Sequence, residues 1–432
     1  MIRAEEFARR RLRLMEEAGE QAMVVLAAAP EAIRNGDSHY PYRQDSDFFY
    51  LTGFAEPDAV LVLLPGREKA QQLMFCRERN PERERWDGPR LGLEGAREQL
   101  GMDDAFPIED LDEILPGLME GCERIYHLVG KDLQLDQRII GWRNRLRAAH
   151  KGERGPGELV SLEHLLHEQR LIKSRDELRC MNKAARISAT AMTRAMRRCQ
   201  AGASEADLMA ELLHEYHRHS CQPAYQPIVA GGDNALVLHY IANNRALPDD
   251  GLVLIDAGCE FQGYAADISR TFPVSGRFSP AQRELYDLVL AAQNAAIDQV
   301  RPGRPFEAYH EAAVRTLTAG LIELGLLSGD LDQLIENQTY RRFYMHKTGH
   351  WLGLDVHDVG DYRLEGQSRV LEKNMVVTVE PGLYIGYEDD IPEQWRGIGI
   401  RIEDDIRVTG DEPENLTRSV PRLADEIEAV MR

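Results

Sequence analysis

The sequence has few basic residues for its number of acidic ones. Its 432 residues include 52 Lys and Arg against 72 Asp and Glu, which gives a formal net charge of -20. A protein that binds nucleic acid without sequence preference places many Lys and Arg against phosphates, so this charge argues against nucleic-acid binding. The same charge disfavours adhesion to an anionic membrane surface. Hydrophobic residues at 43% and charged residues at 29% are typical of a globular protein.

Long apolar runs and paired cysteine motifs are also missing. The longest apolar run near the N-terminus, residues 22–29, is far shorter than the ~20 residues that cross a bilayer. The six cysteines include no C-x-x-C pair, which predicts reduced, mostly buried thiols in a reducing compartment. The first residues mix charges of both signs and contain no signal-like apolar stretch. We therefore expect a cytoplasmic protein without a membrane contact.

The first part of the chain alternates short apolar runs with helical patterns. Residues 58–64 and 71–75 predict two neighbouring strands around the turn at Pro65-Gly66, and residues 133–149 predict a helix. Residues 151–157, KGERGPG, are rich in glycine and charge. We interpret that segment as the connection between two domains.

The second part contains three predicted helix starts. Ser174 opens a capping box with Glu177, Ser204 precedes a second helix, and Ser279-Pro280 begins a third. Strand-like runs lie between and after these helices, at residues 252–255, 264–272, 375–379 and 398–408. This order predicts an α+β domain with a mostly antiparallel sheet.

Four acidic residues lie within or directly after the strand-like runs. They are Asp256, Asp267, Glu380 and Glu403. A carboxylate in such a setting is normally paired, hydrogen-bonded or bound to a metal ion. Any one of them alone would more often be part of a structural ion pair or a capped turn. Four together, with a segment that supplies His350 and His357, favour one shared explanation.

Several segments resemble the proline-specific members of the pita-bread metallopeptidases, family M24, and above all the aminopeptidase P group. The matching segments are LIDAGCE around Asp256, GYAADISRTFPV around Asp267, GHWLGLDVHDVG around His350 and His357, TVEPGLYI around Glu380, and GIRIEDD around Glu403. Residues 38–63 also resemble the amino-terminal domain of that group. One departure is Lys347-Thr348, where a smaller or less charged pair is expected; it bears on access to His350.

The resemblance implies an architecture of two domains. Residues 1–172 would form a smaller α/β domain of the aminopeptidase P type. Residues 173–432 would form a pita-bread domain, with a curved and mostly antiparallel sheet covered by helices. The family likeness also implies a homodimer or homotetramer.

The resemblance further implies a centre with two divalent metal ions. Its ligands would be Asp256, Asp267, His350, Glu380 and Glu403, with Asp267 and Glu403 bridging the ions. Oxygen-rich ligation with a single imidazole favours Mn²⁺, while Zn²⁺ and Co²⁺ stay open. Two such ions can activate water for attack on a peptide bond. The implied reaction releases the first residue of a peptide whose second residue is proline, through a hydroxide that bridges the ions.

The same likeness suggests residues that act on the substrate. His239 and His357 would hydrogen-bond the scissile carbonyl, although either can instead be a packing or surface histidine. Glu380 would pass a proton to the departing proline nitrogen. Arg401 would pair with a metal-binding carboxylate or a substrate group, or make a structural ion pair. Tyr384 would contact the substrate, and Trp86 would reach a neighbouring subunit's site.

Two other functions stay open. A prolidase would use the same metal ligands on Xaa-Pro dipeptides alone, and the ligand motifs cannot separate the two activities. A non-catalytic peptide- or protein-binding module of the same fold is disfavoured, because such a module would be expected to lose metal ligands. Peptides with proline in second position are therefore the expected substrates.

Overall fold

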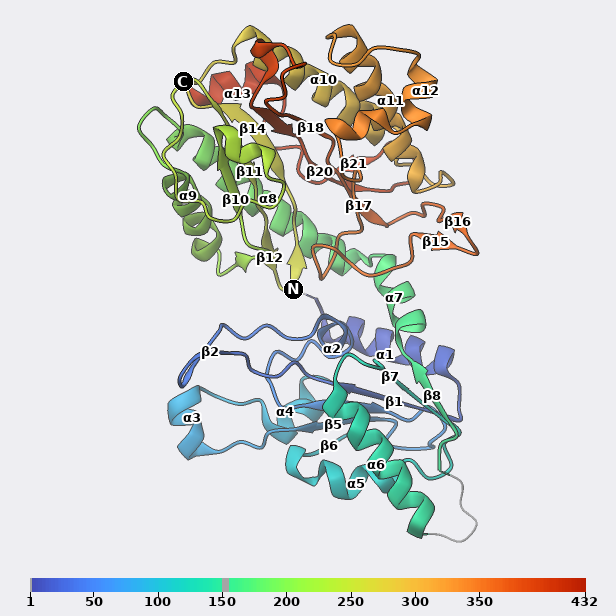
Figure 1. The fold of residues 1–432 in the computed structure, drawn as a ribbon. Coiled ribbons are helices and arrows are strands. Elements are labelled where there is room, and N and C mark those ends of the chain that lie inside the picture. The colour runs from blue at the N-terminus through green and yellow to red at the C-terminus, as the bar shows by residue number, and fades with distance from the viewer. Residues whose placement is uncertain (1, 150–154) are drawn as a thin grey trace. The chain divides into compact units, whose positions relative to one another are not determined.

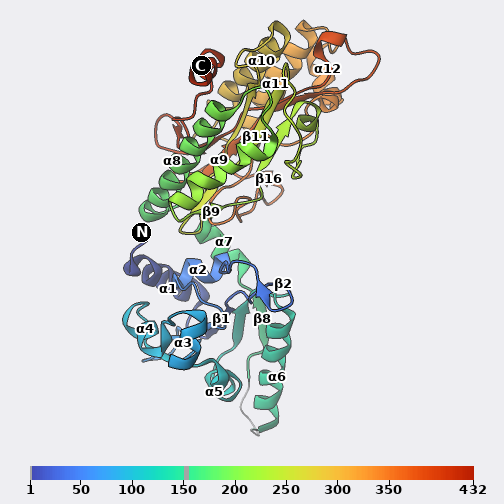
Figure 2. The same ribbon diagram turned by 90° about the vertical axis from the view of Figure 1, so that its left-hand side faces the viewer.

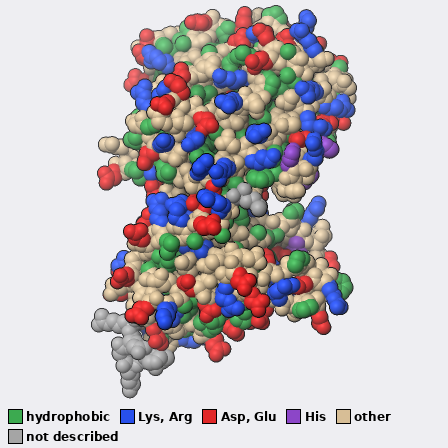
Figure 3. Space-filling view, turned by 180° about the vertical axis from the view of Figure 1, so that it is seen from behind, with side chains coloured by type: hydrophobic (Ala, Val, Ile, Leu, Met, Phe, Trp, Pro, Cys, Tyr) green, Lys and Arg blue, Asp and Glu red, His purple; other side chains and the backbone are tan. Residues whose placement is uncertain are grey.

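The computed structural model describes residues 2–149 and 155–432, which form two compact units (Figure 1). One unit comprises Ile2–Arg170 and the other Leu171–Arg432. In the described part of the chain, no helix has the length and apolarity needed to cross a membrane. On the face drawn in Figure 3, acidic and basic side chains are interspersed, and the described residues form no broad basic surface there.

The N-terminal unit is built on a mixed six-stranded sheet in the order β6-β5-β4-β1-β7-β8. The strands are β1 (Ala22–Ala27), β4 (Val60–Leu63), β5 (Gln72–Cys76), β6 (Asp104–Pro107), β7 (Arg124–His127) and β8 (Glu158–Ser161), with a separate hairpin of β2 (Ile33–Asn35) and β3 (Ser38–His39). β4 pairs antiparallel with β1 and β5, while β1–β7, β5–β6 and β7–β8 are parallel. The two neighbouring strands predicted around Pro65-Gly66 are therefore confirmed.

Helices supply the rest of the N-terminal core. They are α1 (Ala4–Ala18), α2 (Ser46–Thr52), α3 (Pro81–Asp87), α4 (Gly92–Glu98), α5 (Leu111–Leu118), α6 (Leu133–Ala149) and α7 (Glu163–Leu171). Leu115 of α5 and Trp142 of α6 pack with Val25, Val62 and Phe75 of the sheet. The helix predicted at residues 133–149 is confirmed.

The predicted connection at residues 151–157 is wrong as a domain boundary. Residues 151–154 lie outside the described residues, but β8 follows them and pairs with β7 as a strand of the N-terminal sheet. The chain leaves this unit only at Arg170, near the end of α7. A glycine-rich charged segment is equally suited to a loop within one unit, and its composition does not separate the two cases.

A buried acid ties α2 to the end of the N-terminal unit. Asp47 is 2% exposed, and Oδ1 accepts a hydrogen bond from Arg170 at 2.7 Å. Lys131 Nζ lies 3.1 Å from its other oxygen, and His167 Nε2 lies 3.5 Å away. Burial opposes ionisation of Asp47, but the hydrogen bond from His167 and the charges of Arg170 and Lys131 hold its pKa well below the ordinary value.

The helices of the C-terminal unit begin where the capping signals predict. α8 (Arg175–Arg198), α9 (Glu205–Arg218) and α10 (Pro280–Ile297) each start with a complete capping box. The other helices are α11 (Glu307–Glu323), α12 (Leu331–Glu336) and α13 (Ala424–Met431). Figure 2 shows α8 and α9 lying side by side against the strands of this unit.

The strands of the C-terminal unit pair antiparallel throughout, as predicted. They are β9 (Gln222–Pro223), β10 (Ile228–Gly231), β11 (Leu252–Asp256), β12 (Cys259–Phe261), β13 (Tyr264–Ala265), β14 (Ser269–Pro273), β15 (Arg363–Leu364), β16 (Gln367–Ser368), β17 (Val376–Val379), β18 (Gly382–Ile385), β19 (Ile398–Arg401), β20 (Asp404–Arg407) and β21 (Glu414–Asn415). The orders are β10-β11-β14, β13-β12-β9, β17-β20-β21, β18-β19 and β15-β16.

Two runs predicted as continuous strands are each broken in two. Asp267 lies between β13 and β14, and Glu403 lies between β19 and β20. At each break a backbone N–H leaves the strand ladder. The Asp267 N–H donates to the Asp405 carboxylate at 3.2 Å, and the Glu403 N–H donates to the Ser269 carbonyl at 3.0 Å. Both breaks occur at acids that face the same cavity.

Candidate metal centre

The four acids singled out in the sequence converge on one cavity, although they come from distant strands. Asp256 ends β11, and its backbone pairs with Ser269 at the start of β14. Glu380 directly follows β17. A cavity of about 540 Å³ is lined by these four acids together with His239, His350, His357 and Arg401. The five predicted metal ligands thus share one concave site.

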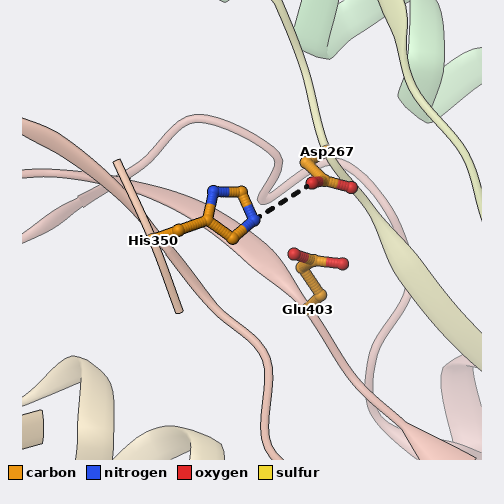
Figure 4. A group of neighbouring side chains, drawn as sticks. All are labelled: Asp267, His350 and Glu403. Atoms are coloured by element: carbon orange, nitrogen blue, oxygen red, sulfur yellow. Dashed lines mark ion pairs between the residues drawn. The ribbon is translucent and has the colours of Figure 1, made fainter. Parts of the chain in front are cut away.

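Asp267, His350 and Glu403 form the tightest group in this cavity (Figure 4). Each of the three offers one ligand atom, and these atoms all lie within 4.8 Å of one another. His350 Nε2 lies 3.5 Å from Oδ2 of Asp267 and 3.7 Å from Oε1 of Glu380. His350 Nδ1 lies 2.9 Å from the Trp351 carbonyl, to which it can donate. That contact orients the ring so that Nε2 faces the carboxylates.

The electrostatics of the cavity fit a cation-binding site. Burial raises the pKa of Glu380 to about 7, and burial with the neighbouring carboxylates raises the pKa of Glu403 well above its ordinary value. Burial disfavours a charged His350, but the hydrogen bond with Asp267 and the charge of Glu380 raise its pKa to about 9. Carboxylates crowded in a buried site need more positive charge than one imidazole and one guanidinium supply. Their oxygen-rich donor set suits divalent ions such as Mn²⁺.

Arg401 joins the carboxylates at one edge of the site. Its guanidinium donates to Oδ2 of Asp256 at 2.7 Å and to the Tyr384 hydroxyl at 2.9 Å. A third N–H, Nε–H, donates to the Ser269 hydroxyl at 2.9 Å, and that hydroxyl donates to Oε2 of Glu403 at 2.7 Å. Arg401 is only 4% exposed. Arg401 was expected to pair with a metal-binding carboxylate, a substrate group or a structural partner. These contacts match the first of these roles, with Asp256 as the carboxylate.

The two predicted substrate histidines border the same cavity. The rings of His350 and His357 lie 4.4 Å apart at an interplanar angle of 82°. His239 lies in the loop that follows β10. Tyr384 lies behind Arg401, is 4% exposed and is not among the residues that line the cavity.

Trp86 lies on α3 of the N-terminal unit and is 85% exposed. Its contact with a neighbouring subunit stays a prediction, as do the catalytic roles of the residues around the cavity.

Sequence reasoning missed three residues that hold the candidate ligands in place. The Tyr225 hydroxyl lies 2.7 Å from Oδ1 of Asp256 and 2.5 Å from Oδ1 of Asp267. Asp405 accepts the backbone N–H of Asp267, and Ser269 links Arg401 to Glu403 as described above. Asp405 had a visible signal, because it is a further acid next to Glu403 in an apolar run. No such signal in the sequence marked Tyr225 or Ser269.

A buried carboxylate also holds the loop that carries His239. Glu205, the first residue of α9, is 0% exposed. One of its oxygens accepts from the Gly231 N–H at 2.9 Å and from the Asn234 side chain at 2.7 Å. The other accepts from the Tyr240 hydroxyl at 2.8 Å and from the Arg245 N–H at 2.9 Å. Both ends of the loop are therefore fixed to one side chain.

The chain matches two protein-family models. Residues 179–410 match metallopeptidase family M24, and residues 7–126 match the aminopeptidase P N-terminal domain. The Xaa-Pro aminopeptidase of Escherichia coli is 45% identical over 100% of this chain and 98% of its own length. The Xaa-Pro aminopeptidase of Haemophilus influenzae is 45% identical over 99% of this chain and 97% of its own length.

Solved structures agree with these matches. The Pseudomonas aeruginosa aminopeptidase PepP superposes with a TM-score of 0.98 at 53% identity, covering 100% of this chain and 99% of that one. Aminopeptidase P from E. coli with the inhibitor Pro-Leu gives 0.96 at 44% identity, covering 100% of this chain and 98% of that one. The predicted family and fold class are confirmed. The chain belongs to metallopeptidase family M24 and is a metallopeptidase of the aminopeptidase P group.

Proposed function

We propose that this protein is a metal-dependent aminopeptidase that releases the first residue of peptides with proline in the second position. The observation that carries the proposal is the cavity in which Asp267, His350 and Glu403 offer ligand atoms within 4.8 Å of one another. Asp256 and Glu380 line the same cavity, so the full set of candidate ligands is present. The Xaa-Pro aminopeptidases among its full-length relatives support the choice of substrate.

Two divalent ions fit this donor set. Asp256, Asp267, His350, Glu380 and Glu403, which all line the cavity, would hold them. When bound, the ions would supply an activated water and Lewis-acid stabilisation of charge on the scissile carbonyl. Mn²⁺ is our first choice because four of the five ligands are carboxylates. Zn²⁺ and Co²⁺ are the alternatives, and one E. coli aminopeptidase P structure is described as Zn-substituted.

The protein side chains would orient the substrate and move the proton. His357 and His239 border the cavity, where an N–H of either ring can donate to the carbonyl oxygen as negative charge develops on it. Glu380 lines the same cavity and would carry a proton to the departing proline nitrogen. Arg401 would hold Asp256 in place through their 2.7 Å contact. We further propose a cytoplasmic homodimer or homotetramer.

The test is a comparison of peptide substrates with and without metal. After chelation, hydrolysis of an Xaa-Pro-Yaa tripeptide, an Xaa-Pro dipeptide and an Xaa-Ala-Yaa control is measured before and after Mn²⁺ is restored. We expect metal-dependent cleavage of the tripeptide and no cleavage of the control. Activity on the dipeptide alone would instead assign a prolidase. No cleavage by the metal-loaded protein would contradict a catalytic function.

A further inference from the structure

Thr348 belongs to the short segment Lys347-Thr348, in which the chain departs from the pattern expected for the aminopeptidase P group. The Lys347 side chain lines the cavity and is 68% exposed, whereas Thr348 is 0% exposed. A residue at that depth does not control entry to the cavity. What Thr348 does must therefore follow from the groups that its carbonyl and its hydroxyl contact.

The backbone of Thr348 belongs to a short ladder that joins two candidate metal ligands. The Glu380 N–H donates to the Thr348 carbonyl at 2.7 Å, and the Thr378 N–H donates to the His350 carbonyl at 3.0 Å. The His350 N–H in turn donates to the Thr378 hydroxyl at 3.1 Å. A Cβ on Gly349 would lie 1.9 Å from the Thr378 carbonyl oxygen, so only glycine permits this close approach. The ladder fixes the backbones of His350 and Glu380 relative to each other.

The hydroxyl of Thr348 ties this ladder to its surroundings. It lies 2.8 Å from Nδ1 of His310, a residue of α11, and 2.6 Å from the hydroxyl of Tyr344. A hydroxyl can donate one hydrogen bond and accept another, so it satisfies both partners at once. Tyr344 is 0% exposed and His310 is half-buried. Two polar side chains therefore share one oxygen atom behind the candidate centre.

The three side chains of this cluster carry no charge at neutral pH. Burial lowers the pKa of His310 to about 4 and raises the pKa of Tyr344 well above its ordinary value. The Thr348 hydroxyl does not ionise in this range. Removal of that hydroxyl therefore alters the position of the ladder and leaves the charge around the candidate metal ligands unchanged.

We propose that Thr348 is a positioning residue for the candidate metal centre. Its hydroxyl, held between His310 and Tyr344, would set the placement of the ladder. The ladder in turn would fix where the side chains of His350 and Glu380 meet a metal ion. The proposal rests on the proposed function, in which both residues hold the ions and Glu380 carries the proton. Loss of an outer hydrogen bond that orients a metal ligand typically costs about 10- to 100-fold in metal affinity or activity.

The test compares Thr348→Val, which removes the hydroxyl and keeps the branched shape, with Thr348→Ser, which keeps the hydroxyl. Mn²⁺ affinity is measured by calorimetry after chelation, and kcat and KM for Ala-Pro-Leu are measured at saturating Mn²⁺. We expect Thr348→Val to bind Mn²⁺ about tenfold or more weakly, and to lower kcat by a similar factor at nearly unchanged KM. Thr348→Ser should restore both values to within about threefold of the wild type.

Thr318→Val is the matched control. Thr318 also lies on α11 and is 0% exposed, its hydroxyl donates to the Val314 carbonyl at 2.7 Å, and it is not among the residues that line the cavity. Its Mn²⁺ affinity and kcat should equal those of the wild type. Tyr344→Phe removes one partner of the Thr348 hydroxyl and should also weaken Mn²⁺ binding. Combined with Thr348→Val, its effect should be smaller than the product of the two separate losses.

A Thr348→Val protein that matches Thr318→Val in both Mn²⁺ affinity and kcat would overturn the proposal. So would a Thr348→Ser protein that loses as much as Thr348→Val, because side-chain shape would then replace the hydroxyl as the cause. If Thr348→Val does not fold, the comparison of Tyr344→Phe with Thr318→Val decides in the same way.

Metal binding also separates this proposal from the proposed function. Weaker Mn²⁺ binding by Thr348→Val, in a protein whose wild type cleaves no Xaa-Pro peptide, would support the positioning role and contradict the peptidase. Cleavage of Ala-Pro-Leu by Thr348→Val with the kcat and the Mn²⁺ affinity of the wild type would contradict the positioning role alone.

Discussion

Breaking the ion pair between Lys173 and Asp358 should destabilise the C-terminal unit strongly. The two side chains are each 1% exposed, and Nζ lies 2.9 Å from Oδ2. Asp358 follows His357, and its other oxygen accepts from the Asp355 N–H at 3.4 Å. A Cβ on Gly353 would lie 2.1 Å from Oδ2 of Asp358, so only glycine admits the carboxylate here. The pair therefore fixes the loop that carries a candidate substrate histidine.

The expected magnitude follows from this burial. Removing one member of a buried ion pair costs ~3–5 kcal/mol, because the other charge stays buried. For a unit of this size ~1 kcal/mol lowers Tm by ~2–4 °C, so Lys173→Met should lower the Tm of the C-terminal unit by ~6–20 °C. Asp358→Asn should cost a similar amount. The double variant should cost less than the sum of the two, with a coupling energy of ~2 kcal/mol or more.

The assay is a double-mutant cycle read by urea unfolding and thermal melts, with kcat/KM for an Xaa-Pro-Yaa peptide measured on each folded variant. Single variants that cost less than ~1 kcal/mol would contradict a stabilising ion pair, as would strict additivity in the double variant. Retention of full kcat/KM in a destabilised Lys173→Met would show that the loop keeps His357 in place without the ion pair.

Three further results are expected. Glu205→Gln should lower kcat about tenfold without loss of bound metal, because the loop that carries His239 loses a charged acceptor; unchanged kcat would contradict this role. His357→Ala should lower kcat by ~10²-fold at unchanged metal content, as for a lost oxyanion donor. Asp47→Asn should lower the Tm of the N-terminal unit at pH 7. Because the pKa of Asp47 is depressed in the folded protein, its ionised side chain contributes to stability above the ordinary pKa of ~3.9. The difference in Tm between Asp47→Asn and the wild type should therefore shrink as the pH falls below that value. A difference in Tm that does not depend on pH would contradict this prediction.

The sequence predicted those features that depend on local chemistry. The helix starts at Ser174, Ser204 and Ser279 are visible as short patterns, and the structure confirms each of them. The candidate ligands were recognisable because acids such as Asp256 and Glu380 stand at the ends of apolar strands. Burial of a carboxylate is costly without a partner, so the anomaly itself marks the site.

Features that depend on distant contacts could not be read from the sequence. Arg401 and Asp256 are 145 residues apart, and only the folded chain brings them to 2.7 Å. Tyr225 stands in a segment with no periodic pattern, so nothing marked its contact with two acids. The prediction of a domain boundary at residues 151–157 was wrong for a related reason. β8, which follows the glycine-rich segment in the sequence, pairs with β7, so strand pairing rather than loop composition sets the extent of the N-terminal unit.

The five side chains around the cavity are proposed to hold two divalent ions. The most direct measurement is the metal content of the purified, Mn²⁺-loaded protein by inductively coupled plasma mass spectrometry, for the wild type and for Glu403→Gln. We expect about two ions per chain in the wild type and fewer than one in the variant, since Glu403 belongs to the tightest group of candidate ligands. Two ions per chain in both proteins, or none in the wild type, would contradict a two-ion centre built on these ligands.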